Sequence, residues 1–334
     1  MAQNRKMKEN SQAQQEFQSN LHQIFQFNLL LESILSTKMA QNNVSDLLNL
    51  GEFNTMEVRP WEKPAHENKK EKNFVGKHCS TPATVHGLNW LDINCGFNIR
   101  VDPQIVNPTQ EKFTASIRSW SDTQLYSAGF NWLEVPQIFQ YIPYIPLIQT
   151  GTFDTEEKRE WTKPQLKNSK SVQFATPYHA PPKVVCFLRY LDLEKGKNWR
   201  IKTYAGDVTN TGFTINIDSW SDTVMYRASA SWIAYPQDTP GIDSGRFAAT
   251  DIRPWNKPQQ DNSKAVSFTK SFGKAPKIFI ALDEFDYDSA KNLRLKTSVS
   301  DVSPEGFTWH LQAWGDSIMY NAAASYVAWD QPRD

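Results

Sequence analysis

A fifteen-residue segment occurs three times in this chain, and this repetition limits the possible folds more than any other feature. The segment GFTINIDSWSDTVMY at 212–226 returns as KFTASIRSWSDTQLY at 112–126 and as GFTWHLQAWGDSIMY at 306–320. The copies are offset by 100 and 94 residues. A unit of roughly 85 residues is larger than a solenoid or propeller-blade repeat, so each copy is expected to bury its own core.

Three tandem domains are therefore expected, at 47–137, 148–237 and 243–331. Each has a Trp-x-Lys-Pro turn near its start and a large aromatic residue twelve positions after the central Trp. The gaps between them are short and contain prolines, which is typical of linkers.

Residues 1–46 match none of the repeats and are expected to form a separate helical segment. Apolar residues and one Asn follow the alternating three- and four-residue spacing of a heptad. These positions are Leu21, Ile24, Asn28, Leu31 and Leu35. Asn28 favours a parallel two-stranded coiled coil, and hence a homo-oligomer; a helix docked on the first repeat is the alternative, because only about three heptads are present.

Within each repeat, polar and apolar residues alternate with a period of two, which indicates β-strands. In the second copy Phe213 and Ile217 face one side of the strand, so that Trp220 falls on the other, polar side. Trp120 and Trp314 have the same parity. These three tryptophans are therefore predicted to lie outside the core.

An Arg recurs on the same polar side, at Arg100, Arg200 and Arg294. An outward aromatic ring beside a guanidinium is typical of a sugar site, because the ring stacks on the C–H face and the guanidinium donates to hydroxyls. The alternative is that each Arg is only a solvated surface charge.

Other aromatic residues are predicted to pack in the core. Trp132 and Trp232 continue the Ala-rich face of the last strand. The tryptophans of the Trp-x-Lys-Pro turns are assigned to the core as well: Trp61, Trp161 and Trp255.

Charge and residue spacing exclude several classes of function. Lys plus Arg and Asp plus Glu each number 36, so no net charge attracts nucleic acid or an anionic membrane. The six histidines coincide in no two repeats, and the three cysteines occupy no repeated position, so no repeated metal site, nucleophile relay, disulfide framework or cofactor is expected. Two carboxylates do recur, as Asp192 and Asp222 in the second copy, and leave a glycoside hydrolase as an alternative, although Asp222-Thr223 is typical of an Asx turn.

No membrane span is expected, because the longest apolar run, at 25–35, contains polar residues. The Gln-rich start lacks the compact apolar region of a secretory signal, so a cytoplasmic protein, or one released by a non-classical route, is expected. A glycan-targeted scaffold or toxin with a membrane-active N-terminal helix is a further alternative.

The motifs Leu-Asp, Asn-x-Arg, Gly-Phe and Trp-x-Asp-(Thr/Ser)-x-x-Tyr follow one another in each repeat with minor substitutions. In order and spacing they resemble the H-type lectin domain of snail agglutinins and the C-terminal domain of discoidins. The resemblance covers nearly all of each repeat. It implies a six-stranded antiparallel β-sandwich, a three-fold assembly and recognition of N-acetylgalactosamine or galactose without catalysis.

The resemblance also implies which residues contact the sugar. They are Arg100, Trp120, Ser121 and Tyr126 in repeat one, Arg200, Trp220, Ser221 and Tyr226 in repeat two, and Arg294, Trp314, Gly315 and Tyr320 in repeat three. Parity alone would place the tyrosines on the core side of the last strand. Gly315 removes a side-chain contact, so repeat three is expected to bind more weakly or differently.

In such lectins a loop of a neighbouring protomer completes the site. The candidates for its hydroxyl-reading amide are Asn68, Asn168 and Asn262, each six residues before a Phe. A chain with three copies is expected to be a multivalent agglutinin whose repeats form one intrachain pseudo-trimer. The alternative assembly stacks each repeat with its copies from two other chains.

Overall fold

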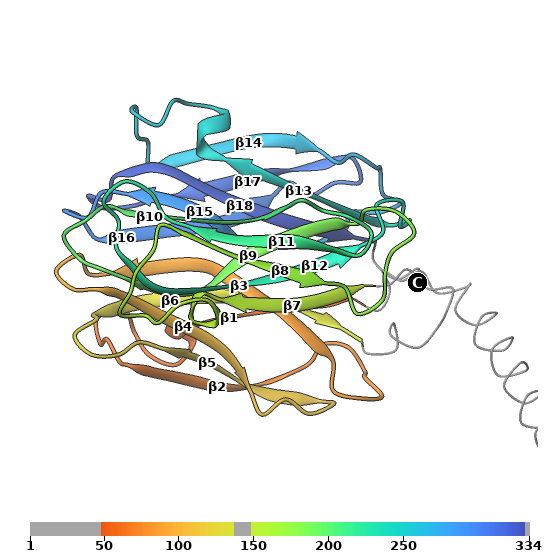
Figure 1. Ribbon diagram of the computed structural model, residues 1–334, viewed down its shortest axis with the longest axis horizontal. Coiled ribbons are helices and arrows are strands. Elements are labelled where there is room, and N and C mark those ends of the chain that lie inside the picture. The colour runs from red at the N-terminus through yellow and green to blue at the C-terminus, as the bar shows by residue number, and fades with distance from the viewer. Residues whose placement is uncertain (1–47, 137–147, 331–334) are drawn as a thin grey trace, which may run out of the picture. The chain divides into compact units, whose positions relative to one another are not determined.

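The computed structural model describes residues 48–136 and 148–330, and nearly all regular structure in this part of the chain is β (Figure 1). The predicted helix within 1–46 lies outside the described residues. Each repeat contributes six strands and one short 3₁₀ turn. All strand pairs are antiparallel, so the predicted fold class is confirmed.

The three repeats have the same order of elements. Repeat one contains β1 (Asn49–Asn54), η2 (Thr55–Glu57), β2 (Glu67–Asn73), β3 (Ala83–Ile93), β4 (Ile99–Val106), β5 (Lys112–Arg118) and β6 (Leu125–Val135). Repeat two contains β7 (Gln149–Asp154), η4 (Thr155–Glu157), β8 (Lys167–Gln173), β9 (Lys183–Leu193), β10 (Trp199–Gly206), β11 (Gly212–Asp218) and β12 (Met225–Tyr235). Repeat three contains β13 (Ile242–Ala248), η5 (Ala249–Asp251), β14 (Asp261–Ser267), β15 (Lys277–Tyr287), β16 (Leu293–Ser300), β17 (Gly306–Gln312) and β18 (Met319–Trp329).

The six-stranded sheets cross the repeat boundaries. One sheet has the order β1-β6-β3-β16-β17-β14, a second β13-β18-β15-β10-β11-β8, and a third β2-β5-β4-β9-β12-β7. Each sheet therefore joins three strands of one repeat to three strands of another, and the joints run from repeat one to two, two to three, and three back to one. The repeats thus pair within a single chain, as the pseudo-trimer prediction requires.

Buried apolar residues hold these joints. Val101 pairs with Leu191 across β4 and β9, and Ile201 pairs with Phe285 across β10 and β15. All four are fully buried. The expectation that each copy buries its own core is wrong in this respect, because one continuous cluster of buried side chains extends through all three repeats.

Inside each repeat the two halves of three strands pack face to face through aromatic rings. Phe113 on β5 contacts Trp132 on β6 with ring centroids 5.0 Å apart, and Phe213 on β11 contacts Trp232 on β12 at 5.2 Å. Both tryptophans are buried, so their assignment to the core is confirmed. Edge-to-face packing of this kind is favourable beyond the area that it buries.

A second apolar cluster lies where the three repeats meet. It contains Val85, Phe187 and Ala281 from β3, β9 and β15, together with residues of β6, β12 and β18. Gly87 on β3 also lies here, and a Cβ at this position would stand 2.6 Å from Cβ of Ala281 and 2.8 Å from Cβ of Phe187. Only glycine permits this approach of the three middle strands.

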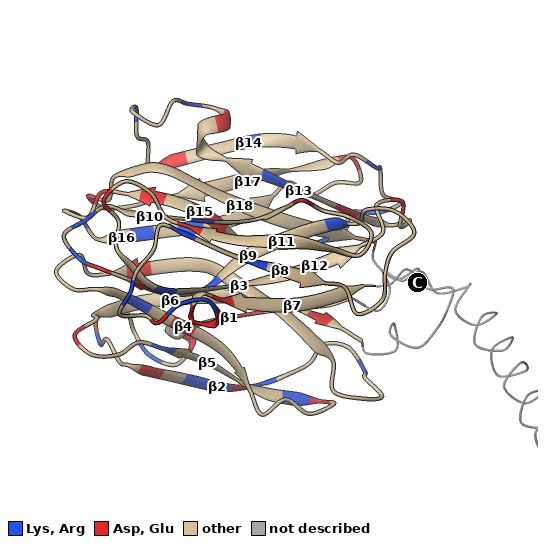
Figure 2. Cartoon of the chain, viewed as in Figure 1, with Lys and Arg blue, Asp and Glu red and all other residues tan. Residues whose placement is uncertain are grey.

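Charged residues of both signs alternate over the strands and loops, as Figure 2 shows. No helix among the described residues is long and apolar enough to cross a membrane. The arrangement agrees with the balanced composition of the chain.

Candidate functional site

Each joint between repeats carries an Arg that contacts two carboxylates. At the joint of repeats one and two, Arg100 on β4 forms an ion pair with Asp122 of its own repeat and lies with Nε 3.4 Å from Oδ1 of Asp192 on β9. The register aligns Arg100 with Asp192 directly. The other two joints repeat this arrangement with Arg200, Asp222 and Asp286, and with Arg294, Asp316 and Asp92.

The repeated Trp follows the strand that ends next to this Arg. Trp120, Trp220 and Trp314 are half-buried, so the prediction that they lie outside the core is confirmed. The ring of Trp120 lies 5.4 Å from that of Tyr190 in repeat two, and the ring of Trp314 lies 5.2 Å from that of Trp90 in repeat one.

The residue after each Trp adopts a left-handed backbone conformation. Ser121 and Ser221 have φ values of 58° and 57°, and Gly315 has 64°. The turn is closed by the amide of the third residue after the Trp, as Thr123 donates to the carbonyl of Trp120 at 3.3 Å. A left-handed residue here leaves Ser121 and Ser221 exposed at the mouth of the site, and glycine meets the same requirement without strain.

A cavity of about 530 Å³ lies at the joint of repeats one and two. Repeat one supplies Arg100, Trp120 and Ser121, and repeat two supplies Asp192 and Tyr226. The further lining residues are Asn98, Glu156, Trp161, Tyr190 and Arg227. The site is therefore built by two repeats.

The order of the motifs groups the Arg, Trp and Tyr of one repeat in one site, but in the structure the Tyr comes from the next repeat. Tyr226 of repeat two, and not Tyr126, lines the cavity of Arg100. Tyr320 of repeat three similarly lies close enough to Arg200 for the two to interact electrostatically. The three tyrosines are half-buried rather than core, and the hydroxyls of Tyr226 and Tyr320 donate to Glu194 and Asp288, both at 2.9 Å.

The three predicted amide residues, Asn68, Asn168 and Asn262, do not reach a site. They lie on β2, β8 and β14 and are 1%, 3% and 1% exposed. The side-chain amide of Asn168 donates to the carbonyls of Gln165 and Ile217 at 3.0 and 3.1 Å, and its oxygen accepts from Arg159. A buried amide with its hydrogen bonds used is structural, so this prediction is wrong.

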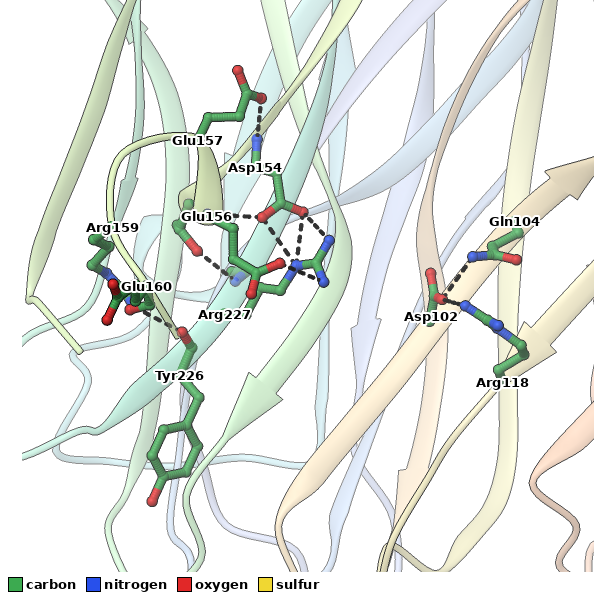
Figure 3. A network of polar contacts seen from close by, with 12 residues as sticks. Asp102, Gln104, Arg118, Asp154, Glu156, Glu157, Arg159, Glu160, Tyr226 and Arg227 are labelled. Carbon is green, nitrogen blue, oxygen red and sulfur yellow. Dashed lines mark hydrogen bonds and ion pairs between the residues drawn. The ribbon is translucent and has the colours of Figure 1, made fainter. Parts of the chain in front are cut away.

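An Arg that the sequence reasoning missed holds the loop before each of these strands. Arg159 donates from Nε to Asn168 at 2.6 Å, from Nη1 to the carbonyl of Tyr226 at 2.8 Å and from Nη2 to that of Met225 at 2.7 Å. Figure 3 labels Arg159 and Tyr226. Arg59 and Arg253 make the equivalent contacts. We call this Arg and its hydrogen bonds the clamp. The clamp fixes the loop to the start of the last strand of the same repeat.

The clamp positions a Trp that sequence reasoning placed in the core. Trp61, Trp161 and Trp255 are 51%, 53% and 62% exposed, so that assignment is wrong. Each ring stands edge-on to the Tyr of its repeat, at 6.1 Å for Trp61 and Trp161 and 6.2 Å for Trp255. Trp161 lines the same cavity as Trp120, and its threefold recurrence in Trp-x-Lys-Pro was the signal for such a role.

The two carboxylates on each Arg have different acidities. Burial raises the pKa of Asp192 to about 6, against the opposing charge of Arg100. Asp92 and Asp286 are raised to about 6 for the same reason. The hydrogen bond from Arg100 lowers the pKa of the exposed Asp122. Each site thus contains a carboxylate that changes protonation close to neutral pH.

Within residues 48–136 and 148–330, no group of three His, Cys, Asp or Glu side chains is placed to hold a metal ion. The site offers several aromatic rings, a guanidinium donor and a carboxylate acceptor. This set can bind a polar ring compound that carries hydroxyls.

Comparisons with known proteins identify the family of the chain. The family model described as H-type lectin domain matches residues 69–133, 169–235 and 263–329, more than half of the chain. A curated relative, "ATP synthase subunits region ORF 7" of Fuscovulum blasticum, is 28% identical over 69 residues, which are 21% of this chain and 60% of the relative. The chain thus spans less than two thirds of that relative's length.

Two solved structures of discoidin II from Dictyostelium discoideum are also similar. They match 57% of this chain and 95% and 94% of their own, at 10% identity and with TM-scores of 0.24 and 0.25. The three family matches are independent of these structures, and each contains the Arg and the Trp of one repeat. The resemblance seen in the motifs is therefore confirmed, and the chain belongs to the H-type lectin domain family.

Proposed function

We propose that the chain is a multivalent lectin that binds terminal galactose or N-acetylgalactosamine in three sites, one at each joint between repeats. The observation that carries this proposal is the cavity that Arg100 and Trp120 of one repeat form with Asp192 and Tyr226 of the next. Its chemistry is that of sugar recognition rather than of bond cleavage.

Aromatic rings supply the apolar part of the site. A galactose ring has an axial 4-hydroxyl, which leaves one face of C–H groups free to stack on an indole. Trp120 is half-buried beside Tyr190, so its orientation is set before a ligand arrives, and Trp161 is an exposed ring that lines the same cavity. A preorganised pair of rings lowers the entropic cost of binding.

Polar groups supply the specificity. Arg100 can donate to sugar hydroxyls, and the carboxylate of Asp192 can accept from them. Asp122 and Asp192 both contact the same guanidinium, which holds it in place. If the two acids of each joint acted as a hydrolase pair, a chromogenic galactoside would release free sugar, and Asp222→Asn would remove the contribution of one joint in three; the proposal expects no release.

Three sites in one chain, and about six in a dimer formed through the N-terminal segment, would give avidity two to four orders of magnitude above single-site affinity where the geometry permits. A glycan array on the full chain tests the sugar specificity. Light scattering on the full chain and on residues 49–334 tests the dimer: a particle of two chains that becomes one chain supports it, whereas an unchanged mass contradicts it.

Trp220→Ala is expected to remove one of three binding sites while the fold persists. The ring lies after the end of β11 and is half-buried, so its loss removes the stacking platform with little packing. Isothermal titration calorimetry with a galactoside should give two sites per chain instead of three, with the melting temperature nearly unchanged.

Two further variants make this result interpretable. Val75→Ala also removes an exposed apolar side chain, and should retain three sites. Trp232→Ala removes a buried ring and should cost about 3–5 kcal/mol of stability. Three sites of unchanged affinity in Trp220→Ala, or a loss of stability as large as that of Trp232→Ala, would show that Trp220 is packing only.

Binding is expected to weaken as pH falls through about 6. Asp92, Asp192 and Asp286 accept sugar hydroxyls best when ionised, and each has a pKa raised to about 6. At pH 5 roughly one tenth of each is ionised, so affinity should fall about tenfold between pH 8 and 5. Titration calorimetry at fixed ionic strength measures this.

Protonation of Asp92, Asp192 and Asp286 does not unfold the chain, so unfolding through these carboxylates cannot explain the loss of affinity at low pH. Their pKa is higher in the folded chain than in the unfolded chain, so the folded chain binds protons more readily between about pH 4 and 6, and their protonation stabilises it. Asp192→Asn should make one site independent of pH. An unchanged affinity from pH 8 to 5 in the unmodified chain would contradict the role of these carboxylates.

A further inference from the structure

A second cavity, of about 580 Å³, adjoins the first at the joint of repeats one and two. The two cavities share Trp120, Ser121, Tyr190 and Arg227. A sugar stacked on Trp120 therefore has the second cavity beside it, in reach of a substituent or of the next sugar of the glycan.

Three arginines line the second cavity, and two of them are neutralised. Arg227 lies between Asp154, at 3.0 Å, and Glu156, at 2.7 Å. Arg118 contacts Asp102 at 2.6 Å. Figure 3 shows both groups, with Arg227 enclosed by its two carboxylates and Arg118 on the neighbouring strands of repeat one.

The third arginine, Arg189 on β9, forms no hydrogen bond or ion pair within the described residues, and its Nε is buried without an acceptor. The carboxylates of Asp102 and Asp154 attract the guanidinium of Arg189 only at longer range, and the positive charge of Arg227 repels it. Burial lowers the pKa of Arg189, but a guanidinium stays protonated at neutral pH. Arg189 is half-buried, and its buried Nε without an acceptor is costly; an anion that enters the cavity would relieve this cost.

The equivalent positions at the other two joints differ in charge. Repeat three has Asp283 there, which is buried and paired with Arg246 at 3.1 Å. Repeat one has Asn89, whose amide donates to Asn131 at 2.7 Å. Lys296 at that joint lies 5.4 Å from the ring of Trp90.

We propose that the joint of repeats one and two binds acidic galactosides, with an oxyanion, either a carboxylate or a sulfate ester, placed on Arg189 in the second cavity. The proposal rests on the proposed lectin function, because the neutral sugar occupies the first cavity. A guanidinium binds a carboxylate or sulfate through two parallel hydrogen bonds, which makes it a specific receptor for such groups. The chain is then a lectin with one acid-selective site in three.

The test compares a neutral, a sialylated and a sulfated galactoside on the full chain by titration calorimetry. The unmodified chain should bind the neutral sugar at three sites, with the site of Gly315 weaker than the other two. An acidic galactoside should show one site per chain about tenfold tighter, and this preference should weaken between 50 and 500 mM salt because it depends on charge. Whether the sialylated or the sulfated sugar has the tight site identifies the anion.

Arg189→Gln should remove the tight site and leave neutral binding at all three sites. Lys112→Gln is the matched control: it removes an exposed charge of repeat one that lies outside both cavities, and should keep the tight site. A tight site that persists in Arg189→Gln, or three sites of the unmodified chain that do not distinguish acidic from neutral galactosides, overturns the proposal. If no galactoside of any charge binds, the lectin function itself is wrong.

Should Arg189→Gln fail to fold, the comparison of sugars and salt on the unmodified chain still decides. Arg189→Lys then serves as the second variant, since it keeps the charge and loses the fork of donors. It should retain a weakened acid preference.

Discussion

The middle repeat alone, residues 148–236, is expected to give no folded monomer. In the excised repeat β9 loses its partner β4, and β10 loses its partner β15. Two six-stranded sheets are thereby reduced to three strands each, with open inner edges. The excision also exposes Phe187, Ile233 and Tyr235, which are buried where the repeats meet. Open edges and an exposed apolar patch favour association or unfolding.

Circular dichroism with light scattering tests this expectation. The excised repeat should either lack a cooperative thermal transition or fold only as a self-associated particle that restores the shared sheets. The full chain, treated identically, is the control and should melt cooperatively. A monomeric repeat that melts cooperatively would show that the joints add little to its stability.

Arg159→Met is expected to cost about 3–5 kcal/mol of the free energy of unfolding. Arg159 is 7% exposed and donates to one amide oxygen and two backbone carbonyls, which the variant leaves without a donor. Hydrogen bonds to a charged group contribute more than neutral ones, and buried acceptors left unpaired are costly. Urea unfolding measures the difference.

Lys163→Met is the matched control for the clamp. Lys163 belongs to the same loop and pairs with Glu160 at 3.1 Å, but both side chains are largely exposed. Exposed pairs contribute about 0–1 kcal/mol, so this variant should be close to neutral. If the two variants lose the same free energy of unfolding, the hydrogen bonds of Arg159 do not stabilise the loop.

Strand alternation was sufficient to predict which face of a strand a residue occupies. Phe213 and Ile217 are buried and Trp220 is not, as period two requires. Alternation was insufficient to predict which strands pair, because it identifies the apolar face of β10 but does not say whether its edge pairs with a strand of the same repeat or of the next repeat. Pairing is settled by contacts far apart in the chain, such as that of Ile201 with Phe285.

The residues that were misassigned from the sequence lie in segments where polar and apolar residues do not alternate. β8 is polar except for Val172, KNSKSVQ, so nothing in the sequence distinguishes the buried Asn168 from its exposed neighbours. Trp161 lies in a loop of charged residues before Pro164, where no period applies, and hydrophobicity alone assigned it to the core. In the structure it is exposed, while the adjacent Arg159 is buried and hydrogen-bonded to the last strand.

The closed order of the joints, one to two, two to three and three to one, has a consequence for how the sites can diverge. In an assembly of three identical chains, any substitution appears at every interface. Here each interface is encoded separately, so position 189 can be Arg while its counterparts are Asp283 and Asn89. Covalent linkage therefore lets each joint change independently of the other two, and lets an engineer substitute the residues of one joint without altering the others.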